Sequence, residues 1–195
     1  MPGGLLPWLG ILWLIFSASA GVRAAEADAE PPVIATITAI KGTVHLSRDG
    51  ASVWDLATTN RLHAGDRVRT DERSRATLQM RDGSVVQLDE LTQVTLGAVE
   101  SRGVIDVLKG ILSFFHRDKP GSLEVRGGGL AGIIRGTEFT FGVAPDGTVD
   151  VVLLDGEVAL TNPHGDLALK SGQSATATPT TAPRLSARVL RAPSP

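Results

Sequence analysis

The chain has 195 residues, carries 19 Lys and Arg against 21 Asp and Glu, and contains no cysteine. That length suffices for one domain with a hydrophobic core and is marginal for two. The near-neutral charge, with no basic block, excludes a nucleic-acid binder. The lack of cysteine excludes disulfide bonds, thiolate zinc clusters and thiol chemistry.

The N-terminal part has the pattern of an export signal. The first twenty residues contain no Asp, Glu, Lys or Arg, and an almost unbroken apolar run covers residues 5–16. The segment Ala18-Ser19-Ala20 fits the small-x-small pattern of secretory cleavage sites, and Val22-Arg23-Ala24 is a second possible site. We predict an apolar signal helix over 1–24, cleaved after one of these alanines, and a leader over 25–33. The alternative is an uncleaved inner-membrane anchor, and both forms predict that the rest of the chain is exported to the periplasm.

Beyond the leader, short runs of strand-forming residues alternate with turn signals such as Asp82-Gly83 and Asp155-Gly156. Asp-Gly pairs tolerate the positive φ of tight hairpins. No window shows the apolar period of a long helix. The pattern predicts an all-β domain over 34–178, either an elongated twisted β-sandwich or a solenoid-like roll of short strands. The predicted strands are 33–40, 43–46, 67–69, 76–80, 85–88, 94–96, 105–108, 111–115, 123–125, 133–141, 149–154, 158–160 and 167–169.

A weak internal repeat supports the rolled arrangement. The segment 42-GTVHL-46 is matched by 156-GEVAL-160 and more loosely by 110-GILSF-114. A turn and then Gly65-Asp66 follow the first copy, and a turn and then Gly172-Gln173 follow the second. Each copy predicts a strand, a reversal and a short returning strand, stacked so that the coils bury one face against each other.

Residues 179–195 are rich in Ala, Pro, Ser and Thr. Such a composition buries too little apolar surface to offset the entropy lost on ordering. We expect a mostly disordered tail, in which Leu185, Val189 and Leu190 could dock weakly.

The segment 127-GGGLAG-132 contains G-x-G-x-x-G after a predicted strand, as in dinucleotide-binding proteins. That fingerprint requires a helix directly after its last glycine. Here β-branched and aromatic residues, interrupted by Gly136, favour a strand instead. Ile133 and Ile134 stand where a P-loop requires Lys and Ser or Thr. We predict no nucleotide cofactor and interpret the glycines as allowing a tight crossing or bulge between strands.

The residues that follow, 134-IRGTEF-139, resemble the motif of the FecR domain, an aliphatic residue followed by Arg-Gly-Thr-x-Phe. The resemblance covers about residues 34–178. One departure is Gly127-Gly128-Gly129, where the family commonly has a Thr-Pro pair. The expected structural residues are Gly65, Asp66, Arg135, Gly136, Thr137, Phe139, Gly156 and Gly172. Further matching pieces, in the family's order, are 42-GTV-44, Trp54 followed by Leu62, 65-GDRVRT-70, 74-SRATL-78, 82-DGS-84, 155-DGEV-158 and 171-SGQ-173.

The resemblance implies an all-β periplasmic domain without catalytic residues. The best-known members lie behind a transmembrane helix and a cytoplasmic part that controls a sigma factor, and they receive a signal from an outer-membrane transporter. Since nothing cytoplasmic precedes the apolar segment here, we carry over only the exported receiving or binding domain.

The residues themselves also predict no enzyme and no metal site. The histidines at 45, 63, 116 and 164 are isolated in the sequence, and no nucleophile-elbow motif is present. An envelope hydrolase would need one of them in a pocket beside a Ser and a carboxylate.

Two charged motif residues have structural interpretations. Arg135 is expected to make a charge-assisted bond to Asp66, Asp155 or Glu157. Asp66, directly after a glycine, is expected to cap its own turn.

Phe114 and Phe115 are adjacent in a predicted strand, so their rings point to opposite faces and at least one lies outside the main core. The strand from Leu112 onward is therefore the candidate binding edge, with Leu112, Phe114 and Phe115 as contacts. Trp54 is expected to pack against Leu56 and Leu62, and an exposed Trp54 would indicate a protein or carbohydrate contact.

The sequence thus predicts a non-catalytic exported module for protein interaction, sensing or scaffolding, with an envelope protein as partner. The alternative is a glycan or peptidoglycan binder, which requires an exposed aromatic platform. A membrane contact is expected only if the signal helix stays uncleaved.

Overall fold

The computed structural model describes residues 31–58, 60–99, 102–116 and 121–187, so the predicted signal helix and its cleavage points lie outside the described residues. The chain divides into two units, residues 1–30 and 31–195, and the second contains every described strand. All regular secondary structure in the described residues is β-strand, which confirms the all-β prediction. Within these ranges, no helix has the length and apolarity needed to cross a membrane.

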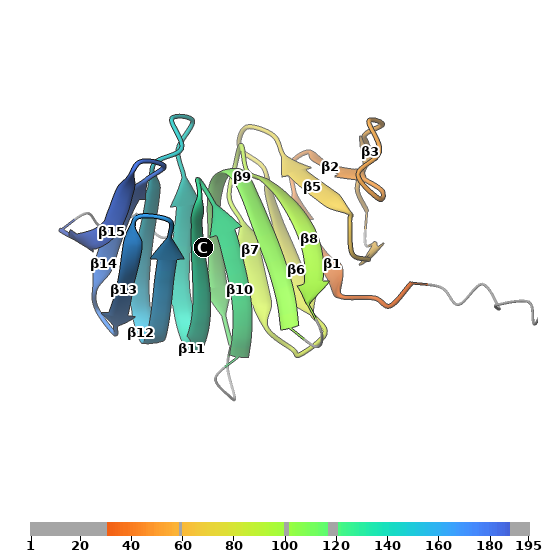
Figure 1. The fold of residues 1–195 in the computed structure, drawn as a ribbon. Helices are drawn as coiled ribbons and strands as arrows, with labels where there is room; N and C mark the ends of the chain where they lie inside the picture. The colour runs from red at the N-terminus through yellow and green to blue at the C-terminus, as the bar shows by residue number, and fades with distance from the viewer. Residues whose placement is uncertain (1–30, 59, 100–101, 117–120, 188–195) are drawn as a thin grey trace, which may run out of the picture. The chain divides into compact units, whose positions relative to one another are not determined.

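Fifteen strands form one continuous hydrogen-bonded sheet (Figure 1). Among the described pairs only β9 and β10 run parallel. The strands are β1 (Ala35–Lys41), β2 (Val44–Ser47), β3 (Asp55–Leu56), β4 (Arg61–Leu62), β5 (Arg67–Thr70), β6 (Arg75–Met80), β7 (Val85–Leu88), β8 (Gln93–Val99), β9 (Arg102–Phe115), β10 (Gly121–Gly127), β11 (Leu130–Val143), β12 (Val149–Asn162), β13 (Gly165–Lys170), β14 (Ser174–Thr178) and β15 (Thr181–Ser186).

The sheet folds over into two layers that enclose the core. The first layer runs β1–β6–β7–β9–β11–β12–β14–β15, and the second runs β2–β5–β8–β9–β10–β11–β12–β13. The strands β9, β11 and β12 belong to both layers. The first half of β9, for example, pairs with β8 and β10, whereas its second half pairs with β7 and β11.

The prediction of short strands is wrong for these three, each of which has 14 residues. The expected strands 105–108 and 111–115 are one strand, as are 149–154 and 158–160. A glycine stands at each joint, with φ 96° at Gly110 and 115° at Gly156. Because glycine adopts positive φ without a steric penalty, the strand bends into the other layer instead of ending.

The layers are joined at two opposite ends of the first layer. Gly110 lies beside Val143, at one end of the first-layer half of β11, and Gly136 lies at the other end, where its strand partner is Gly156. We call the end with Gly42 and Gly110 the first crossing edge, and the end with Gly136 and Gly156 the second crossing edge.

A hydroxyl side chain closes three of these crossings by accepting a hydrogen bond from a backbone N–H at the bend. The bends begin at Gly42, Gly110 and Gly156, which open the three copies of the sequence repeat. The repeat therefore marks the places where the chain changes layer. The three bonds join Ser74 Oγ to the Thr43 N–H (2.8 Å), Thr92 Oγ1 to the Ile111 N–H (3.0 Å), and Ser171 Oγ to the Gly156 N–H (2.9 Å).

One hydrophobic cluster fills the space between the layers. Its largest side chains are phenylalanines, and the rings of Phe114 and Phe139 stack with centroids 5.0 Å apart. Phe141 is also fully buried. Strand alternation alone assigns these residues to the inner face, because every second side chain points toward the core.

The glycine-rich stretch forms a hairpin turn between β10 and β11, and not the predicted crossing or bulge between strands. Gly128 and Gly129 connect β10 to β11 with φ 54° and 79°, and Gly127 pairs with Leu130. Two-residue turns of this kind require positive φ at both central positions. The prediction that a strand follows Gly132 is confirmed, since β11 continues to Val143.

The expected disorder of residues 179–195 is wrong for the part that forms β15. This strand pairs with β14 at the edge of the first layer, and Pro183 within it is buried. An edge strand tolerates a proline because one side of its backbone has no ladder to complete. Backbone pairing orders a segment whose composition alone predicts disorder. Residues 188–195 lie outside the described residues.

Replacing Gly110 with alanine tests the bend in β9. A Cβ there would collide with Thr92, and the left-handed backbone adds its own penalty. We expect Gly110→Ala to lower the free energy of unfolding by about 3 kcal/mol, of which about 1–2 comes from the backbone and the rest from overpacking. Gly83→Ala is the matched control, because Gly83 has φ 88° but no atom within 4 Å of the added Cβ. Equal losses of stability in urea titrations of the two variants would contradict this account.

Candidate functional site

The candidate strand at the end of β9 separates into buried and accessible residues. Leu112 is 0% exposed and Phe114 is 1% exposed, so a partner cannot reach either side chain. The prediction that Leu112 and Phe114 contact a partner is therefore wrong, because strand alternation places both side chains toward the core. Phe115 points to the opposite face and is 42% exposed.

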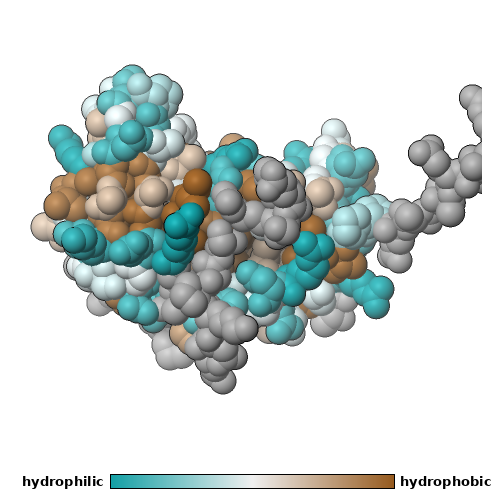
Figure 2. Space-filling view, turned by 60° about the horizontal axis from the view of Figure 1, so that its bottom comes forward, coloured by the Kyte–Doolittle hydropathy of each residue, from teal (hydrophilic) through white to brown (hydrophobic). Residues whose placement is uncertain are grey.

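Exposed large apolar side chains are few, and Figure 2 shows apolar surface bordered by hydrophilic residues. Two of them, Phe115 and Leu154 (46% exposed), line the same groove on the outer face of the first layer. Its volume is about 290 Å³. We call it the Phe115 groove.

One cross-strand row gives the groove a polar side. Thr77, Gln87, Ser113 and Thr140 are successive register partners on β6, β7, β9 and β11. The hydroxyls of Ser113 and Thr140 lie 3.2 Å apart and share a hydrogen bond. Thr140 itself is buried, so the partly exposed Thr77, Gln87 and Ser113 provide the polar atoms along this side of the groove.

The neighbouring row is apolar and ends in a carboxylate. Val85 is the register partner of Phe115, and Phe115 is the partner of Glu138. Leu154 lines the same side from β12. Hydrophobic and acidic groups therefore lie side by side.

Glu138 has a second carboxylate across from it. Its register partner on β12 is Asp155, which accepts a hydrogen bond from Ser171 Oγ at 3.4 Å. Glu138 is exposed and lines the groove. A basic side chain of a ligand could pair with its carboxylate, so the groove suits a ligand with apolar and basic side chains together.

Trp54 lies in a different environment. It is half-buried, and the guanidinium carbons of Arg67 and Arg69, both on β5, lie 5.2 and 4.7 Å from its ring centroid. Leu56, one of its expected packing partners, is 71% exposed. Cation–π contact with two arginines accounts for the position of the ring.

Asp66 is a buried structural hub. It is 2% exposed and accepts hydrogen bonds from Arg48 Nη1 (2.7 Å), the His63 N–H (3.0 Å) and the Asp49 N–H (3.2 Å). The bond from His63 closes the turn that precedes β5, so the predicted capping role is confirmed.

The strand pairing distinguishes between the three acids predicted to bind Arg135. The cation paired with Asp66 is Arg48, so a bond from Arg135 to Asp66 is ruled out as the main contact. In the β11–β12 register, Arg135 lies directly opposite Glu157, another of the three predicted acids.

The remaining motif residues hold the backbone. Gly65 and Gly172 have φ 90° and 80° in turns, and Phe139 is in the core. Gly136 and Thr137 belong to β11 at the second crossing edge.

One Ser–His pair occurs, between Ser84 Oγ and His116 Nδ1 at 2.6 Å. Ser84 is 0% exposed, so a substrate cannot reach its hydroxyl. In the part of the chain that the structure describes, no cluster of three His, Asp or Glu side chains could hold a metal ion.

Sequence reasoning missed Val85, Glu138 and Leu154. Glu138 occupies the variable position of the Arg-Gly-Thr-x-Phe motif, and the other two lie on strands far apart in the sequence. Only the pairing of β7, β9, β11 and β12 brings them together.

Removing the Asp66 carboxylate is expected to destabilise the domain. Asp66→Ala leaves two backbone N–H groups without their acceptor and removes the carboxylate that pairs with Arg48, at a cost of about 2–3 kcal/mol in the free energy of unfolding. Asp82→Ala is the control, because exposed Asp82 accepts one bond, from the Ser84 N–H. Its loss should stay below about 1 kcal/mol. A urea titration in which both variants lose the same stability would show that Asp66 is not a hub.

Comparisons with known proteins agree with the fold. Residues 66–159 match the family model described as FecR protein. Two crystal structures of a proposed anti-sigma factor from Parabacteroides distasonis share the fold, each with a TM-score of 0.53, at 18% and 17% identity. The alignments cover 62% of this chain and 58% of that chain. No curated protein matches the sequence.

Proposed function

We propose that the domain of which residues 66–159 match the FecR family model is a non-catalytic interaction module of the cell envelope that binds a protein partner through the Phe115 groove. The ligand is an extended segment of the partner with an apolar side chain next to a basic one. The domain acts in sensing or scaffolding.

The observation that carries this proposal is that apolar, acidic and hydrogen-bonding side chains line one groove. Phe115 and Leu154 keep apolar surface in water, which favours its burial by a partner. Glu138, facing Asp155, supplies negative charge beside it. The partly exposed Thr77, Gln87 and Ser113 offer hydrogen bonds to a ligand backbone.

The proposal includes a signalling role because the chain shares its fold with the Parabacteroides protein. The Parabacteroides protein is described as a proposed anti-sigma factor, and at 18% identity the likeness concerns the fold alone. Export to the periplasm is part of the proposal and rests on the apolar run at 5–16 and the small residues before Ala20.

The arrangement around Trp54 favours a protein partner over a glycan. A glycan platform needs a bare aromatic face, and here Arg67 and Arg69 lie over the ring. The groove, in contrast, joins apolar and acidic groups that suit a peptide.

Capture from envelope extract tests the proposal. We expect the immobilised full chain to retain a specific protein, and both Phe115→Ala and Glu138→Lys to reduce its recovery at least about tenfold, as for residues at the centre of an interface. Recovery is measured by quantitative mass spectrometry.

Leu108→Ala is the matched control. Leu108 is 66% exposed in the first half of β9, on the second layer and away from the groove. Its removal should leave recovery unchanged. Equal recovery by all variants, or retention on sacculi alone, would overturn the proposal.

A further inference from the structure

The strand β13 ends the second layer with one of its edges unpaired. Within the described residues its only strand partner is β12. An unpaired edge presents a row of backbone groups to which another strand can add. We propose that β13 of a second copy of this chain adds to this edge, so that the protein forms a two-fold symmetric dimer centred on Ala168. The inference goes beyond the proposed function and does not depend on the Phe115 groove.

The register of the β12–β13 hairpin shows which backbone groups of β13 point away from the sheet. Asn162 and Gly165 close the hairpin over a two-residue loop. Neighbouring residues of a strand direct their backbone groups to opposite sides, so the odd-numbered residues of β13 face β12. The Lys170 N–H agrees with this assignment, because it donates to Gln173 Oε1 (2.8 Å), beyond the end of the strand. The residues that face the free edge are therefore Asp166, Ala168 and Lys170.

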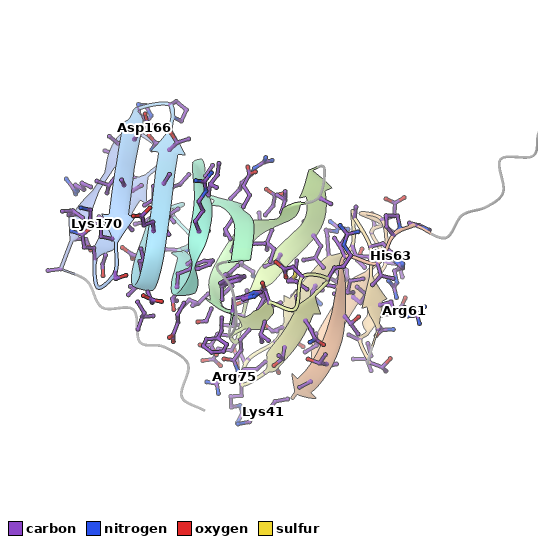
Figure 3. The ribbon with its side chains drawn as sticks, turned by 90° about the horizontal axis from the view of Figure 1, so that it is seen from below. Lys41, Arg61, His63, Arg75, Asp166 and Lys170 are labelled. Atoms are coloured by element: carbon purple, nitrogen blue, oxygen red, sulfur yellow. The ribbon has the colours of Figure 1, made fainter. Side chains whose placement is uncertain are left out.

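The exposed side chains of β13 make this edge self-complementary. Asp166 and Lys170 lie toward the two ends of the strand, at the left of the view in Figure 3, and both are exposed. In antiparallel pairing about Ala168, each Asp166 lies directly opposite Lys170 of the second copy. Opposite charges in such cross-strand positions stabilise a sheet. In the described part of the chain neither side chain has an ion-pair partner, so both charges are available.

Two-fold pairing of β13 could also be centred on other residues, and the charges discriminate against those registers. An axis at Asp166 would place two carboxylates opposite each other, and an axis at Lys170 two ammonium groups, both of which destabilise a sheet. An axis at Leu167 or Leu169 forms neither acid–base pair. Ala168 is the one centre on this strand at which both charged pairs are attractive.

The pairing also extends a row of alternating charge. Arg135, Glu157 and Lys170 are successive register partners on β11, β12 and β13, and all three are exposed. Asp166 of the second copy becomes the next member of this row. Each Lys170 then lies between two carboxylates, one from its own chain and one from the other copy.

The first layer places an apolar side chain at the same level. The strands β13 and β15 contact each other across the layers, and a Cβ added at Gly165 would lie 3.2 Å from Ala182 Cβ. From this point both strands run toward the second crossing edge, because Lys170 pairs with Glu157 and Ser186 lies in the row of Val152. Three residues along each strand, Ala168 and Leu185 therefore come level with each other.

This apolar side chain is Leu185, and the dimer would bury it. Leu185 is 56% exposed, although its register partner Ala175 is buried in the core. A two-fold axis at Ala168 brings the Leu185 side chains of the two copies toward each other at the ends of their first layers. Their apolar surface then leaves water, which favours association.

The symmetry has a consequence for binding. A two-fold axis that pairs two edges of one sheet is perpendicular to that sheet, so both Phe115 grooves lie on the same face of the dimer. A partner with two suitable segments could engage both grooves, and the second contact would then form at a high effective concentration.

Sedimentation equilibrium of the full chain tests the dimer and its charge pairing. We expect a monomer–dimer equilibrium for the wild type. Asp166→Lys and Lys170→Asp should each raise the dimer Kd at least about tenfold, because each turns two attractive pairs into two repulsive ones. An equimolar mixture of the two variants should restore the dimer, since the introduced lysine then faces the introduced aspartate and native Lys170 faces native Asp166.

A single introduced cysteine tests the position of the axis, because the chain has no native cysteine. Opposed residues of a hydrogen-bonded antiparallel pair have Cα atoms about 5.5 Å apart, which suits a disulfide. Ala168→Cys should form an intermolecular disulfide at least about tenfold faster than Ala159→Cys, because pairing holds the two thiols together. Ala159 is the matched control, since it is exposed and is the register partner of Ala168 on β12, one strand farther from the axis in each copy.

Three results would overturn the inference. They are a wild type that stays monomeric as its concentration is raised, a mixture of the charge variants that associates no better than either variant alone, and equal cross-linking of the two cysteine variants. None of them bears on the proposed function, because partner capture is tested at Phe115 and Glu138, on the outer face of the first layer.

Discussion

The fold depends on how its strands change layer without leaving buried backbone groups unpaired. A strand that bends loses a ladder hydrogen bond at the joint, and a buried N–H without an acceptor is costly. Here a glycine with positive φ makes each of three bends. At each bend a Ser or Thr hydroxyl accepts a hydrogen bond from a backbone N–H. Thr92 and Ser74 are themselves buried, so these hydroxyls belong to the interior. This pairing of glycine with hydroxyl allows one continuous sheet to enclose its own core.

The Phe115 groove follows from the same construction. At the second crossing edge, β11 enters the first layer at Glu138 and β12 leaves it after Asp155, which brings two carboxylates into register. Phe114 fills the core by stacking on Phe139, so the adjacent Phe115 has to point outward. An exposed ring beside paired acids is therefore built into the sheet.

The residues that carry the family resemblance and the residues that form the groove are largely different sets. Asp66, Gly156 and Phe139 hold turns, bends and core. Val85, Leu154 and Glu138 lie outside the motif or at its variable position. The motif residues thus hold the scaffold, whereas mostly other residues line the Phe115 groove.

The sequence by itself determined the all-β class, the strand that follows Gly132, the turn role of Asp66 and the outward position of one phenylalanine ring. These follow from local rules, since alternation, positive φ and side-chain capping involve residues close together in the chain. It also marked Gly42, Gly110 and Gly156 as equivalent, but not as bends within long strands. Only the tertiary structure decided that β15 is ordered, that Asp66 pairs with Arg48, and that Phe115, Glu138 and Leu154 share a groove. Those outcomes depend on strand register between distant segments, which no local pattern specifies.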